Sequence, residues 1–78
     1  MTNILNAYKL EKISAYLGIT FPGKVFCVQD SNIFYYRNPD WVPLLTQEHQ
    51  REIEYMENGR MDGFINRFIS EIRSVLSN

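Results

Sequence analysis

The segment from Met61 to Asn78 constrains the fold of this chain more than any other. Its apolar side chains recur at intervals of three and four residues, and polar side chains fill the gaps. The apolar positions are Met61, Phe64, Ile65, Phe68, Ile69, Ile72, Val75 and Leu76. This spacing gathers them on one broad side of an α-helix, so the segment predicts an amphipathic helix that buries that side in a core.

Another helix is expected over residues 3 to 17, because apolar residues at helical intervals share one side of it. These residues are Leu10, Ile13 and Leu17. Thr2 or Asn3 can cap its N-terminus with a side-chain oxygen. Gly18 follows at the place where a helix favours a left-handed residue, so we expect the helix to end there.

Residues 24–29 and 33–37 form two strand-like runs, rich in β-branched and aromatic side chains. Asp30, Ser31 and Asn32 lie between them, which fits a hairpin with a three-residue loop. That loop gives the hairpin one nearly apolar face, made of Phe26, Val28, Phe34 and Tyr36. The other face is mixed and carries Val25, Cys27, Gln29, Ile33, Tyr35 and Arg37.

Because the register of a hairpin follows its buried pattern, we prefer the three-residue loop to a two-residue loop at Ser31 and Asn32. Helices would cover the apolar face. The mixed face would then be left without a cover large enough for it, which makes it the best functional clue in the sequence.

The stretch from Asn38 to Pro43 is expected to be an irregular connection, because each proline pushes the preceding residue out of helical geometry. Thr46 can cap a mostly polar helix from Gln47 to about Asn58. The predicted architecture is a single α+β domain over residues 1–78, in the order α-β-β-α-α, with an antiparallel β-hairpin packed against helices.

Composition excludes several classes of protein. The chain has 78 residues and a net charge of −1, from 8 basic and 9 acidic side chains, which argues against a general nucleic-acid binder. No apolar run approaches the length of about 18 residues that a membrane span needs. A single cysteine and the lack of a recognisable secretion signal indicate a reducing, cytoplasmic setting.

Two residues could suggest chemistry, and neither has the neighbours that it needs. His49 and Glu52 lie on one helix face, but a metal site needs three or four ligands and the chain has one histidine. Cys27 lies between Phe26 and Val28, where a buried or half-buried structural side chain is expected rather than a reactive thiolate. We therefore expect no catalytic residue, metal or cofactor.

Charged residues of both signs populate the last two helices. The acidic ones are Glu48, Glu52, Glu54 and Glu57, and the sequence leaves open whether they form a binding patch or are only solvated. The basic ones, Arg60, Arg67 and Arg73, are interleaved with acidic and amide side chains.

The mixed hairpin face and the tryptophan beside it supply the predicted contact residues, because Tyr, Trp and Arg dominate binding hot spots. The residues expected to bind a partner are Ile33, Tyr35, Arg37 and Trp41. The predicted function is a small non-enzymatic protein-interaction module, of the kind that a bacteriophage or mobile element makes as an inhibitor or adaptor that sterically blocks a host protein. The alternative is a dimeric nucleic-acid-associated regulator that presents Arg60, Arg67 and Arg73, and pairing of hairpin edges would give a homodimer.

Overall fold

A computed structural model describes residues 4–77 and confirms the α+β class. Three helices, a short 3₁₀ helix and a three-stranded antiparallel sheet follow one another along the chain. They are α1 (Ile4–Thr20), β1 (Phe26–Gln29), β2 (Asn32–Arg37), β3 (Asp40–Pro43), α2 (Gln47–Tyr55), the 3₁₀ helix η1 (Asn58–Arg60) and α3 (Met61–Leu76). The proposed caps Thr2 and Asn3 lie outside the described residues.

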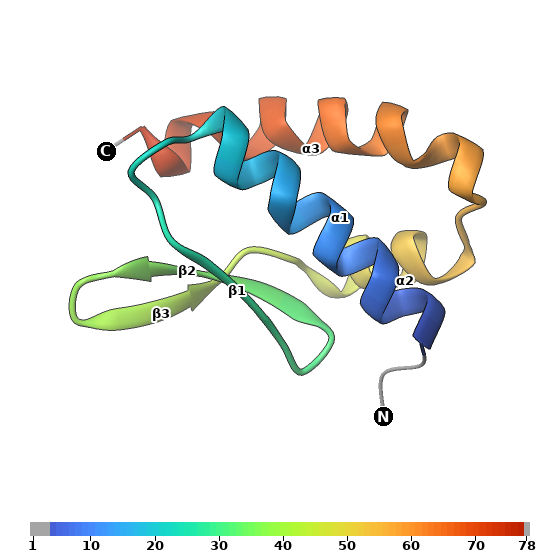
Figure 1. The fold of residues 1–78 in the computed structure, drawn as a ribbon, viewed down its shortest axis with the longest axis horizontal. Coiled ribbons are helices and arrows are strands. Elements are labelled where there is room, and N and C mark those ends of the chain that lie inside the picture. The colour runs from blue at the N-terminus through green and yellow to red at the C-terminus, as the bar shows by residue number, and fades with distance from the viewer. Residues whose placement is uncertain (1–3, 78) are drawn as a thin grey trace.

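The helices lie on one side of the sheet, and the core lies between the two layers (Figure 1). Helix α3 is confirmed as the main amphipathic element. Its buried residues are Met61, Phe64, Ile65, Phe68, Ile69, Ile72 and Leu76, whereas Val75 is 47 % exposed. None of the helices within residues 4–77 is both long enough and apolar enough to cross a membrane.

The prediction that α1 ends at Gly18 was wrong. The Phe21 N–H donates to the carbonyl of Leu17, so the hydrogen-bond pattern of the helix continues past Gly18. Phe21 is buried and forms part of the core, and the left-handed glycine is Gly23, with φ of 90°, in the turn that follows. The helix therefore runs on until Phe21 reaches the core, and Pro22 and Gly23 then reverse the chain.

The predicted register of the first hairpin was also wrong. Asp30 and Ser31 alone form the turn, with φ values of 52° and 59°, and Gln29 pairs with Asn32. Positive φ at both central residues is the geometry that best matches the twist of a two-residue hairpin. This register places Ile33 opposite Val28, one residue away from the predicted partner, and it exchanges the faces of every β2 side chain.

Asn32 has a different role from the loop residue that we expected. Its side-chain oxygen accepts hydrogen bonds from the backbone N–H groups of Ile33 and Leu45, and its side-chain nitrogen donates to the carbonyl of Leu45. The amide group thus pairs with both backbone groups of Leu45, as a neighbouring strand would. It fixes the start of β2 to the segment that follows β3.

Strand β3 occupies the segment predicted to be irregular. Arg37 pairs with Asp40 across a turn whose Asn38–Pro39 peptide bond is cis, and Tyr36 pairs with Trp41. Pro43 is tolerated because β3 is an edge strand. The N–H of Leu44 donates to the carbonyl of Ile33 on β2, so the backbone nitrogen of residue 43 points away from β2 and needs no hydrogen to donate.

Helix α2 is held at both ends by side chains. Thr46 caps its N-terminus, as predicted, but the helix ends at Tyr55 rather than near Asn58. The buried Lys9 of α1 donates from Nζ to the carbonyls of Ile53, Glu54 and Met56, at 2.8, 3.3 and 2.6 Å. These carbonyls have no partner within the helix, and the negative end of the helix dipole favours a cation there.

Replacing Lys9 by Met tests this capping role, because Met preserves the apolar stem and removes the ammonium group. We expect Lys9→Met to lower the free energy of unfolding by about 2–3 kcal/mol, since several partly buried carbonyls lose a charged donor. Urea unfolding followed by circular dichroism measures the change. Arg51→Met, at an exposed residue of α2, is the control and should change stability by less than about 0.5 kcal/mol; equal effects of the two variants would contradict the capping role.

Candidate functional site

The sheet has an outer face that the helices do not cover. Cross-strand partners share a face, and the buried Ile33 and Tyr35 mark the inner one. Their neighbours along β2, Phe34 and Tyr36, therefore point outward. We define the outer sheet face by Val25, Cys27, Phe34, Tyr36, Trp41 and Pro43.

These six side chains lie in two rows across the sheet. In the first row Tyr36 lies between Trp41, its partner on β3, and Val25, whose carbonyl accepts from the Tyr36 N–H. Val25, Tyr36 and Trp41 are 56 %, 42 % and 47 % exposed. In the second row Phe34 lies between Cys27 and Pro43, with Phe34 and Cys27 half-buried.

The two large aromatic rings of the first row contact each other. The ring centroids of Tyr36 and Trp41 are 5.2 Å apart and their planes are tilted by 52°. The Tyr36 hydroxyl is within 3.2 Å of the side-chain oxygen of Asn38, to which it donates. The pair thus presents a large, pre-ordered apolar surface with a polar rim, which is a combination typical of binding hot spots.

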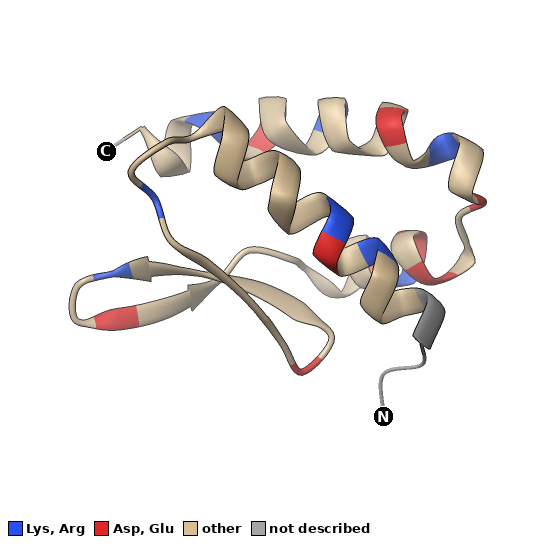
Figure 2. Cartoon of the chain, viewed as in Figure 1, with Lys and Arg blue, Asp and Glu red and all other residues tan. Residues whose placement is uncertain are grey.

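Charges lie at the two ends of the sheet rather than across it (Figure 2). Within residues 26–43 the charged residues are Asp30 in the first turn and Arg37 and Asp40 beside the second. Arg37 and Asp40 are opposite each other and carry opposite charges, so this end has no net charge. Because Arg37 alternates with Tyr36, this pair belongs to the side of Ile33 and Tyr35, and none of the six residues of the outer sheet face is charged.

The structure separates the four predicted contact residues. Ile33 and Tyr35 are 0 % and 4 % exposed, so the prediction that they form a partner surface was wrong, because the true register turns them into the core. Arg37 and Trp41 are exposed, and their contact with a partner stays a prediction. Sequence reasoning missed Phe34 and Tyr36, which the predicted register had placed on the covered face.

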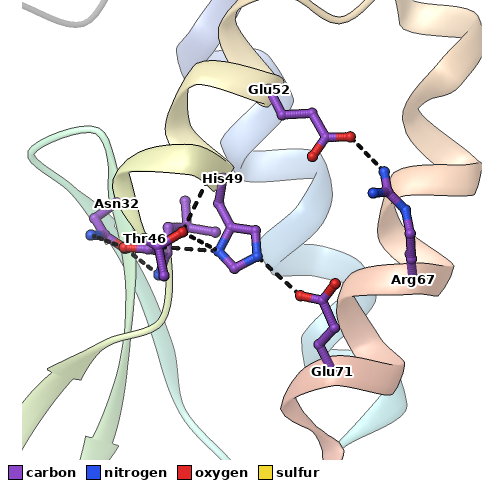
Figure 3. A network of polar contacts seen from close by, with 7 residues as sticks. Asn32, Thr46, His49, Glu52, Arg67 and Glu71 are labelled. Carbon is purple, nitrogen blue, oxygen red and sulfur yellow. Dashed lines mark hydrogen bonds and ion pairs between the residues drawn. The ribbon is translucent and has the colours of Figure 1, made fainter.

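His49 joins the start of α2 to α3 (Figure 3). The Thr46 N–H donates to His49 Nδ1 at 3.0 Å, and the His49 N–H donates back to the Thr46 hydroxyl. Nδ1 is therefore the unprotonated ring nitrogen, and Nε2 carries the proton and donates to Glu71 on α3 at 3.0 Å. The ring also meets Phe68 edge-on, with centroids 5.0 Å apart.

Most of the arginines named for phosphate binding are engaged within the molecule. Arg67 donates to Glu52 across α2 and α3 and lies over the ring of Phe64 (Figure 3). The hydrogen bond that Arg67 donates to Glu52 and the negative charge of Glu52 raise the pKa of Arg67 above the ordinary value. Arg73 lies over the ring of Phe21. Glu52 is thus one acidic α2 residue with a defined partner.

A shallow groove of about 580 Å³ lies between α2, η1 and α3. Its lining is Glu52, Tyr55, Met56, Glu57, Arg60, Gly63, Phe64 and Arg67. The charged residues of this lining are two acidic and two basic side chains, so the groove favours no single charge of ligand. Within residues 4–77 no three or more His, Cys, Asp or Glu side chains gather as a metal site would require.

No protein-family model matches this chain, and no curated protein or solved structure matches it either.

Substitution of His49 tests whether it is a structural residue. His49→Ala removes the cap, the bond to Glu71 and the ring contacts together, and should lower the free energy of unfolding by about 1–2 kcal/mol. Glu71→Ala removes only one exposed pair and should cost less than about 1 kcal/mol. His49→Gln keeps a side-chain acceptor at the third helical position and should lie between them.

The measurement is urea unfolding of the three variants under identical conditions. An effect of His49→Ala no larger than that of Glu71→Ala would contradict a capping role for His49.

Proposed function

We propose that this protein is a small non-enzymatic module that binds another protein through the outer sheet face. The observation that carries the proposal is the exposed pair of Tyr36 and Trp41, whose rings contact each other on an apolar face. A small domain gains stability by burying its aromatics, so leaving these two in water calls for a reason outside the monomer fold. Covering by a partner protein supplies one.

The balance of charge favours a protein partner over a nucleic acid. A surface that binds nucleic acid by stacking bases on aromatic rings normally surrounds them with basic side chains that track the phosphates. The outer sheet face has no charged residue among its six, and the nearest arginine of β2, Arg37, is opposite Asp40. The arginines on the helices offer little compensation, since Arg67 and Arg73 already pack on aromatic rings of this chain.

The proposed mechanism is steric. A partner that binds Tyr36 and Trp41 has part of its own surface covered by this protein. That coverage can inhibit the partner, or recruit it, without any chemical step. The rigidity of the sheet supports this role, because the face is presented with little loss of conformational freedom on binding.

Site-specific photo-crosslinking tests the proposal in cells that make the protein naturally. A photo-reactive phenylalanine analogue at position 41 should form a covalent adduct with one discrete protein. The same analogue at Tyr55, which is 81 % exposed on α2, is the matched control and should not form that adduct. Once the partner is known, Trp41→Ser should weaken its binding by about tenfold or more, as expected for a hot-spot aromatic.

Two further results separate loss of the contact from other effects. Trp41→Ser should leave the unfolding midpoint almost unchanged, which separates loss of contact from loss of fold. Adducts that form from position 55 and not from position 41, or adducts that nuclease digests, would contradict the proposal.

A further inference from the structure

Helix α1 carries apolar side chains on the side that faces away from the core. Leu10, Ile13 and Leu17 are buried beneath it, whereas Tyr8 and Ile19 are 59 % and 79 % exposed. A helix that is apolar on both sides is normally covered on both sides. In Figure 1, α1 lies in front of α2 and α3, and no other element covers it.

Four residues form one straight stripe along the outward side of the helix; three of them are exposed and Lys12 is half-buried, while Tyr16, which is 41 % exposed, flanks the stripe. Tyr8, Lys12, Ala15 and Ile19 are separated by four, three and four residues, which is the spacing of the seam in a two-helix coiled coil. We call these four residues the α1 stripe. In the heptad notation Tyr8 and Ala15 take the d positions and Lys12 and Ile19 the a positions, so Lys12 is the single polar residue of the seam.

The charges beside the stripe complement one another when two copies of α1 lie parallel. Glu11 takes the g position that flanks the seam, next to the a position of Lys12. In a parallel pair related by a two-fold axis, Glu11 of each copy comes beside Lys12 of the other. Lys12 meets its own copy across the axis, as a-position residues do, and the two Glu11 side chains beside it offset that repulsion. Lys9 of α1 is buried and bonded to the carbonyls at the end of α2, so it takes no part in the seam.

Gly18 is a second and independent indication that another helix can approach α1 closely. It lies inside α1, where glycine is less favourable than alanine, and its backbone needs no left-handed conformation. A Cβ at this position would meet nothing within 4 Å, so packing within the monomer does not require glycine either. On the Glu11 flank of the stripe, its missing side chain leaves room for a second helix.

We propose that two copies of this chain associate in parallel through the α1 stripe. Helix α1 is roughly 25 Å long at 1.5 Å per residue, so this contact buries less than the ~1,200 Å² of a standard stable interface. The dimer is therefore weak and reversible. Because α1 packs on the inner side of the sheet, both outer sheet faces remain free, and the dimer would present two of them.

Sedimentation equilibrium over a range of concentrations tests the association. The unaltered chain should change from monomer to dimer as concentration rises. Ile19→Glu places a charge in the seam and should raise the dissociation constant about tenfold or more. Val75→Glu, at an exposed apolar residue of α3, is the control and should leave the dissociation constant unchanged.

A charge exchange tests the proposed contact between Glu11 and the partner's Lys12. Glu11→Lys and Lys12→Glu should each weaken the dimer, because each brings like charges together. The double variant that carries both changes should recover most of the lost affinity, which a general effect on solubility or stability cannot produce.

Disulfide formation tests the parallel direction. In a Cys27→Ser background, Ile19→Cys should form a covalent dimer under mild oxidation much faster than Val75→Cys, since only the former meets its own copy across the two-fold axis. A chain that is monomeric at every concentration, or a dimer that Ile19→Glu leaves intact, overturns the proposal. Preferred cross-linking of Tyr8→Cys to Ile19→Cys in a mixture overturns the parallel arrangement.

Discussion

The register of the β1–β2 hairpin decides which aromatic side chains lie in the core and which face water. Asp30 and Ser31 form a two-residue turn with positive φ, and the amide of Asn32 pairs with the backbone of Leu45. Together they fix β2 so that Ile33 and Tyr35 point inward. A slip of one residue would exchange the two faces, burying Phe34 and Tyr36 and exposing Ile33 and Tyr35. The core, the third strand and the outer sheet face all depend on this alignment.

Polar side chains that bond to the backbone make the rest of the fold specific. The side-chain amide of Asn32 bonds to the backbone of Leu45 as a neighbouring strand would. Lys9 donates to carbonyls at the C-terminal end of α2, and His49 accepts from the Thr46 N–H at its N-terminal end. Each connects segments that are far apart in the sequence or closes a helix end that would otherwise need water. Helix α2 has one fully buried apolar side chain, Ile53, so these bonds largely determine where it lies. Apolar packing drives the collapse, and these bonds select one arrangement from it.

The sequence predicts the helices better than it predicts the sheet, for a physical reason. The apolar positions of α3 repeat over four turns, so its buried face is over-determined, and Thr46 is a strong local cap signal. The hairpin register depends on whether Asp30 and Ser31 adopt positive φ, which their residue types allow but do not require. A loop that includes Asn32 places Ile33 and Tyr35 on the wrong face. Pro39 and Pro43 argue against a strand in the sequence, although the edge strand β3 and the turn before it tolerate both. The buried Lys9 gave no sequence signal, because its partners are backbone carbonyls more than forty residues away.

We propose two separate apolar surfaces on this molecule, one for a partner protein and one for a second copy of the chain. Both the register and the partner surface require that the outer sheet face is open to solvent in the free monomer. Trp41 is the only tryptophan, so its fluorescence reports on this face alone. The most direct measurement is acrylamide quenching of that fluorescence in dilute native protein, compared with the urea-unfolded chain. We expect red-shifted native emission and ready quenching in the folded state. Blue-shifted emission that acrylamide reaches only after unfolding would show that Trp41 is buried, and would contradict both the register and the site built on it.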